Sequence, residues 1–239
     1  MSTISHTVTY SVQPDFARIN MLAHDFFEIA KKNCELVIFN RKNPVPVPEE
    51  YEDWEAHDTQ VKETLHASIQ CIVFSAMACE AAIYDLAAIH LSDDFARSID
   101  KLDVIGKWMV VPSLICGRAL VETGPAMNLL NSLIKVRNKL VHHKSISAIP
   151  VSDDPKVREK AFDDGRAQMA RFTEGALPAL EAVILLSLEL NRVLGVPTGV
   201  LPFFETHITR QSSRQESADI LKLINKCRQT DANNRRDPI

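Results

Sequence analysis

The residue types that could do chemistry gather in one short segment. Residues 137–142, RNKLVH, offer a guanidinium, a carboxamide and an imidazole. On a helix, Arg137 falls in an apolar stripe, three residues after Ile134 and four before Val141. A charge in such a stripe must be paired or face a shared cleft, because an unpaired buried charge is strongly destabilising. The segment therefore predicts either an ion pair or a charged cleft.

The imidazole of His142 has a polar neighbour on the same helix. Asn138 lies four residues earlier, so its side chain could orient the imidazole. In the last turn the helix dipole favours protonated His142, while His143 and Lys144 oppose it. Arg137 and His142 are five positions apart, about 7.5 Å along a helix axis and about 140° around it. Either the helix unwinds near His142, or two copies of the chain assemble the site.

A second charge is out of place at Glu80. It interrupts the apolar face of an upstream helix between Met77 and Ile83. Glu80 is the natural partner of Arg137 if the two helices are neighbours. A buried Glu80–Arg137 pair could simply fix helix register, since structural ion pairs of this kind are common.

Together these features resemble the HEPN domain superfamily. Arg137 and Asn138, followed after three residues by His142 near a helix end, are similar to its signature. The preceding segment Ser75–Tyr84, with Glu80 embedded in it, resembles the family's upstream helix. The similarity covers about Ala67 to His143. It implies a helical bundle that commonly forms homodimers, and many members are metal-independent ribonucleases.

The resemblance also implies a reaction. A ribose 2′-OH would attack the adjacent phosphate, giving a 2′,3′-cyclic phosphate and a 5′-OH. His142 would transfer protons, because imidazole titrates near neutral pH. Arg137 would hold the phosphate and stabilise charge on its oxygens. Asn138 would orient His142 or contact the phosphate, with Glu80 and His143 as supporting residues and no cofactor.

Charge gives limited support for RNA binding. The net charge is −4, which does not suit a generally basic nucleic-acid binder. Lys135, Lys139 and Lys144 could provide positive potential beside the motif. Residues 206–239 also carry seven basic and four acidic side chains, although a solvated helix with a loose end is the preferred interpretation of that tail.

Three functions remain open at this point. The first is an RNA-cleaving toxin or defence effector, a homodimer with an antitoxin or other regulatory protein as a possible partner. The second is a non-catalytic HEPN-like module that binds RNA or protein. The third is a structural helical protein that keeps the Glu80–Arg137 pair. Adjacent His142 and His143 point in different directions and lack acidic or cysteine partners at ligand spacing, so we expect no metal.

Composition favours a cytoplasmic location. Five cysteines, an odd number with no CxxC pair, fit buried thiols in a reducing compartment. Residues 1–16 lack a basic start followed by an apolar run, so no secretory signal is expected. The most apolar stretch, residues 176–194, contains a proline, two glutamates and an arginine, too many interruptions for a membrane span.

The elements that must position these side chains are helices. Scarce glycine and helical spacing of apolar residues predict an all-α, up-and-down bundle of four to five helices. We expect an N-terminal segment over 1–14, the HEPN-like bundle over 15–197, and a basic C-terminal extension with one short satellite helix over 198–239. A proline-rich loop over 43–50 interrupts the bundle. Helices are predicted over 15–42, 58–90, 125–143, 157–194 and 216–228, with a shorter one within 95–116.

Overall fold

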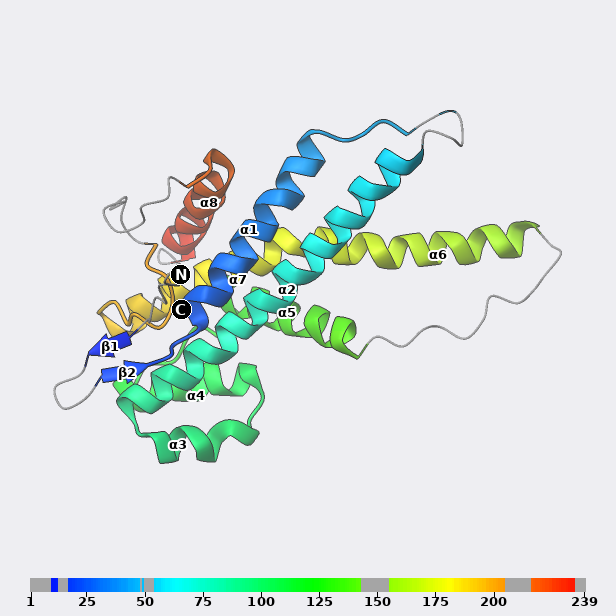
Figure 1. Cartoon of the computed structure of the whole chain (residues 1–239). Helices are drawn as coiled ribbons and strands as arrows, with labels where there is room; N and C mark the ends of the chain where they lie inside the picture. The colour runs from blue at the N-terminus through cyan, green and yellow to red at the C-terminus, as the bar shows by residue number, and fades with distance from the viewer. Residues whose placement is uncertain are drawn as a thin grey trace, which may run out of the picture.

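One long helix organises the molecule, and the described part of the chain is all-α apart from a small hairpin (Figure 1). The computed structural model describes residues 10–12, 17–47, 49, 54–142, 155–204 and 216–234. The helices are α1 (Ala23–Lys42), α2 (Trp54–His90), α3 (Asp93–Ser98), α4 (Val104–Cys116), α5 (Pro125–Val141), α6 (Pro155–Glu174), α7 (Ala176–Leu194) and α8 (Ala218–Asn234), preceded by strands β1 (Tyr10–Val12) and β2 (Ala17–Ile19). Helix α2 packs against each of α1 and α3–α7.

Helix α7 forms the second half of the core. Nearly all of its side chains are buried, and it contacts α1, α2, α4, α5, α6 and α8. The alanine- and leucine-rich sequence makes α7 apolar around most of its circumference. Such a helix must be covered on all sides. Helix α5 packs between α2 and α7, so both core helices determine where the motif lies.

The first helix begins later than predicted. It does not start at Asp15. Residues Ala17–Ile19 pair with Tyr10–Val12 in an antiparallel hairpin, and Asn20 then turns the chain with φ at 61°. Arg18 fixes the hairpin, because its guanidinium bonds Asp85 at 3.0 Å and Asp93 at 2.9 Å. The apolar periodicity predicted the helix itself, but this distant ion pairing sets its start. The helix ends at Lys42, as predicted.

The predicted long helix over 157–194 is two helices. The helix breaks at Gly175, between α6 and α7. Pro178 lies after this break and does not bend a continuous helix. A continuous helix would place the ring of Pro178 against the carbonyl of Glu174, four residues earlier, and would leave that carbonyl without its N–H partner. Ending α6 at Glu174 places Pro178 in the first turn of α7, where no donor is needed. Gly195 ends α7 with φ at 77°, a left-handed cap that favours glycine.

The region between α2 and α5 is more helical than predicted. The side chain of Ser92 caps α3 by accepting from the Phe95 amide at 3.1 Å. A 3₁₀ turn over Ile99–Lys101 follows, and Asp103 then caps α4 by accepting from the Gly106 amide at 2.7 Å. These two caps turn the chain sharply, so α3 and α4 lie together at one end of α2 (Figure 1).

Helix α8 is longer than the satellite helix that we expected, and it packs against α1, α5 and α7. Ion pairs connect it and its leading residues to the bundle: Lys31 with Glu216, Lys42 with Asp219, and Lys226 with Glu181. The domain boundary at residue 197 stays a prediction.

The cysteines are mainly buried thiols, as predicted. All five are free, and Cys116 is the one that is partly exposed. Burial raises the pKa of Cys79 strongly and that of Cys227 to about 12. A hydrogen bond with Cys34, followed by burial, raises the pKa of Cys71. Protonated thiols of this kind are poor nucleophiles, which fits a packing role.

Among the described residues, α2 alone has the length and apolar composition to cross a membrane. The stretch 176–194, which the sequence indicates is too interrupted for a span, is not a candidate. Most of that apolar stretch of α2 is buried inside the bundle. A core helix meets the same two criteria, so α2 is weak evidence for a membrane span.

A buried carboxylate joins α7 to the loop before α5. Glu189 accepts from the Val121 amide at 2.7 Å and lies 3.5 Å from Arg192, which is also 3.5 Å from Asp231. Burial raises the pKa of Glu189 above its ordinary 4.5, although the Val121 amide and Arg192 oppose this and Asp231 adds to it. A carboxyl whose pKa is higher in the folded state loses stabilisation as pH rises through that folded pKa.

We therefore expect a Glu189→Gln protein to gain stability relative to wild type as pH rises from about 4.5 to about 7.5. Glutamine can still accept from the Val121 amide but does not ionise. Urea unfolding at several pH values measures the difference in free energy of unfolding. Glu63→Gln, on the exposed side of α2, controls for the change in net charge. If the difference in free energy of unfolding between Glu189→Gln and wild type does not change with pH, burial does not raise the pKa of Glu189.

Candidate functional site

Helix α5 carries the motif with one face inward and one face toward solvent. Pro125 occupies its first turn, as predicted. Its buried side chains are Ala126, Met127, Leu130 and Leu133. Lys135, Asn138, Lys139 and His142 are exposed, so the polar stripe predicted from the sequence faces solvent.

The predicted contact between Glu80 and Arg137 is present. Arg137 Nη2 donates to Glu80 Oε1, joining α5 to α2 across 57 positions of sequence. The pair is not buried as the register interpretation assumed, because the side chain of Arg137 is 22% exposed and that of Glu80 36%. Water therefore screens the pair, and its contribution to stability is small. The guanidinium lies at a surface that a ligand can reach.

Asn138 does not have the partner that the sequence suggested. Its Oδ1 accepts from Arg137 Nη1 at 3.0 Å, so the amide positions the guanidinium rather than the imidazole of His142. Helical spacing favours the contact with His142, but the guanidinium that Glu80 fixes reaches Asn138 and is the stronger donor.

His142 lies where α5 stops being helical. Val141 is the last helical residue, and the backbone amide of His142 caps the helix by donating to the Asn138 carbonyl at 3.0 Å. The helix therefore ends at His142, but this end does not bring the imidazole to Arg137. His142 is exposed and does not line the cleft beside Arg137. His143 and Lys144 fall outside the described residues.

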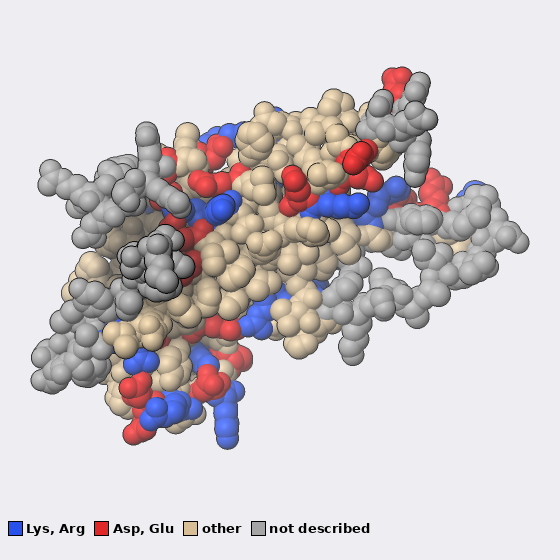
Figure 2. Space-filling model, viewed as in Figure 1, with Lys and Arg blue, Asp and Glu red and all other residues tan. Residues whose placement is uncertain are grey.

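The cleft beside Arg137 has a volume of about 570 Å³, between α2, the 3₁₀ turn with α4, and α5. Its charged and polar lining is Glu80, Asp100, Asp103, Lys107, Arg137 and Asn138, and its other lining is Tyr84, Leu102, Val104 and Ile134. Lys107 Nζ donates to Asp100 Oδ1 at 2.7 Å, which mirrors the Glu80–Arg137 pair. Acidic and basic side chains alternate over this end of the molecule, around α3 (Figure 2).

The wall of this cleft that carries Asp103 and Lys107 was not predicted from the sequence. Lys107 is the one charged residue in the segment Val104–Cys116, the same signal that singled out Glu80 and Arg137. Asp103 precedes that apolar run, as a helix cap should. Neither signal shows that the segment folds back against α2 and α5, because α3 and the 3₁₀ turn set that arrangement.

The hairpin supports the cleft from outside. Arg18 Cζ lies 5.7 Å from the ring centroid of Tyr84, which lines the cleft. Burial raises the pKa of Asp85, the next residue, while its bond with Arg18 opposes the shift. Tyr84, a residue of α2, is therefore positioned by the cation of Arg18 beside its ring.

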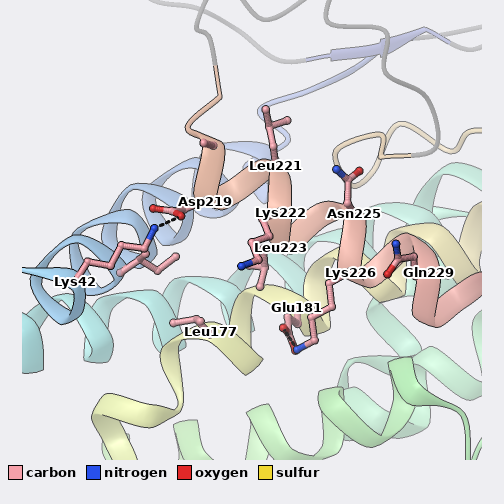
Figure 3. A pocket seen from close by; sticks show the side chains of 12 residues that line it. Lys42, Leu177, Glu181, Asp219, Leu221, Lys222, Leu223, Asn225, Lys226 and Gln229 are labelled. Carbon is pink, nitrogen blue, oxygen red and sulfur yellow. Dashed lines mark hydrogen bonds and ion pairs between the residues drawn. The ribbon is translucent and has the colours of Figure 1, made fainter.

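A larger cavity of about 810 Å³ lies between α1, α7 and α8 (Figure 3). The ion pairs Lys42–Asp219 and Lys226–Glu181 cross it, with Leu177 and Leu223 between them (Figure 3). Of the expected site residues that the structure describes, none lines this cavity. Across the part of the chain that the structure describes, no group of three His, Cys, Asp or Glu side chains could hold a metal ion.

A scan against protein-family models and searches of curated proteins and of solved structures found no match to this chain. The proposed function therefore rests on the residues of α2, α4 and α5 and on their resemblance to the HEPN motif.

Proposed function

We propose that the chain is a HEPN-like, metal-independent endoribonuclease that acts as a homodimer. The supporting observation is how the guanidinium of Arg137 is held. Its guanidinium is fixed by Glu80 and Asn138 at the edge of a cleft and remains partly exposed. A preorganised guanidinium of this kind suits a phosphate whose charge develops during reaction.

In this proposal each side chain has one task. Arg137 binds the phosphate between two nucleotides, and Glu80 and Asn138 position Arg137. His142 takes the proton from the 2′-OH or gives one to the leaving 5′ oxygen. Lys135 and Lys139, exposed on α5, attract the RNA backbone. The products are a 2′,3′-cyclic phosphate and a 5′-OH.

The exposed end of α5 favours a site shared by two copies. His142 stands outside the cleft at that end, which projects from the bundle (Figure 1). A two-fold axis near it would bring His142 of one protomer toward Arg137 of its partner. This activity suits a cytoplasmic toxin or defence effector, with an antitoxin or other regulatory protein as partner.

A second candidate is a non-catalytic HEPN-like module that binds RNA or protein. The composition of the cleft favours it, because three carboxylates outnumber the cations Arg137 and Lys107. Carboxylates repel the phosphate backbone and weaken RNA binding. The same composition suits recognition of a ligand with many hydrogen-bond donors.

Cleavage of RNA in the presence of EDTA tests the proposed function. We expect wild type to leave cyclic phosphate ends and His142→Ala to cleave about 10² to 10⁴ times more slowly, the usual contribution of a general acid or base. His66→Ala, an exposed histidine of α2, is the matched control and should cleave normally. No cleavage by any of the three proteins would favour the binding module, and a need for a divalent ion would contradict a metal-independent reaction.

A further inference from the structure

The cleft offers more than a phosphate site. Arg137 stands on one wall and Lys107 on another, and each is paired with a carboxylate, Glu80 and Asp100 respectively. A phosphate site needs the cations but has no use for additional carboxylates, which repel it. The carboxylates therefore indicate a ligand that brings hydrogen-bond donors as well as an anionic group.

The size and lining of the cleft fit a nucleoside. Its volume of about 570 Å³ lies within the range of about 300–1,000 Å³ usual for small-molecule sites. Tyr84, Leu102, Val104 and Ile134 provide aromatic and apolar surface for the faces of a base. Proteins that recognise single-stranded RNA combine such surface with polar groups that bind the base edge.

Asp103 is the carboxylate best placed to bind a base edge. Its Oδ1 accepts from the Gly106 amide, which fixes the side chain, and no partner of its Oδ2 is found among the described residues. In contrast, Glu80 bonds Arg137 and Asp100 bonds Lys107. A carboxylate held in this way accepts hydrogen bonds without a further cost in side-chain ordering.

Guanine is the base that such a carboxylate selects. Its Watson–Crick edge places the N1 hydrogen beside the N2 amino group, and these two donors match the two oxygens of one carboxylate. Adenine and cytosine each place a ring acceptor beside a single amino donor. Uracil flanks its N3 hydrogen with two carbonyl oxygens, which a carboxylate repels.

We propose that the cleft between α2, α4 and α5 is a nucleoside subsite that binds guanine beside the phosphate held by Arg137, with Asp103 as the specificity-determining residue. This subsite deepens the proposed ribonuclease function and depends on it for its role in cleavage. It assigns the chain a substrate class, single-stranded RNA cut next to guanosine.

Cleavage of a random-sequence RNA, with sequencing of both new ends, tests the subsite. We expect guanine to be enriched at one fixed position beside the cut, and Asp103→Asn to reduce that enrichment about tenfold, since a good bidentate pair discriminates by about 1–3 kcal/mol. Asparagine is also a good helix cap, so α4 should remain folded. Asp163→Asn, an exposed aspartate of α6, is the matched control and should leave the enrichment unchanged.

Binding of 3′-GMP and 3′-UMP, followed by calorimetry, separates the two proposals. We expect wild type to bind 3′-GMP at least about tenfold more tightly than 3′-UMP, and Asp103→Asn to lose this difference. Selective binding without any RNA cleavage would overturn the ribonuclease and leave the subsite standing. RNA cleavage with equal use of all four bases and equal binding of both nucleotides would overturn the subsite and leave the ribonuclease standing.

Discussion

An Arg137→Lys protein should fold as wild type does and cleave RNA about 10² to 10³ times more slowly. Lysine keeps the positive charge, but its three N–H donors all leave one nitrogen. It lacks the planar fork with which Arg137 reaches Glu80 and Asn138 through two different nitrogens and presents a further N–H to a phosphate. Initial cleavage rates and thermal unfolding of the two proteins measure the two effects separately.

Arg166→Lys makes the same replacement at an exposed Asp163–Arg166 pair on α6 and is the matched control. It should leave both cleavage and unfolding unchanged. If Arg137→Lys cleaves RNA at the wild-type rate, the pair with Glu80 is structural and the phosphate-binding role of Arg137 is wrong.

Trp108→Ala should lower the free energy of unfolding by about 3–5 kcal/mol. Trp108 is fully buried between α4 and the core, and its Nε1 donates to the Cys79 carbonyl at 3.3 Å. The substitution removes a large packed surface together with that hydrogen bond. Urea unfolding followed by circular dichroism measures the loss without depending on tryptophan fluorescence.

Trp54→Ala is the control for Trp108→Ala. Trp54 lies at the start of α2 and is half-buried, with His57 as its ring neighbour at 5.4 Å. It should lose much less stability, because it leaves no large cavity. Equal losses in the two proteins would mean that α4 is not anchored through Trp108.

The contact between Glu80 and Arg137 could be predicted because each charge interrupts an apolar stripe, and two such charges on neighbouring helices usually meet. All-α class, the cap at Ser92 and the end of α7 at Gly195 were also predictable, since each depends on local sequence alone. The caps at Ser92 and Gly195 need no knowledge of how distant segments pack, whereas the contact between Glu80 and Arg137 also requires that α2 and α5 are neighbours.

The features that sequence analysis missed depend on distant partners. Asp15 is a good helix cap locally, but Arg18 bonds two aspartates near the end of α2 and draws the chain into a hairpin. Helical spacing predicts a contact of Asn138 with His142, but Arg137, held by Glu80 on α2, donates to Asn138 instead. The wall with Asp103 and Lys107 required the turns around α3, which periodicity does not reveal.

The pair between Glu80 and Arg137 also affects when the site can form during protein synthesis. Glu80 leaves the ribosome 57 residues before Arg137, and α5 packs against α7, whose first residue is Ala176. The cleft therefore cannot be complete until nearly the whole bundle has been synthesised and packed. A nuclease built in this way would remain inert toward the ribosome and messenger that produce it until its own chain is almost finished.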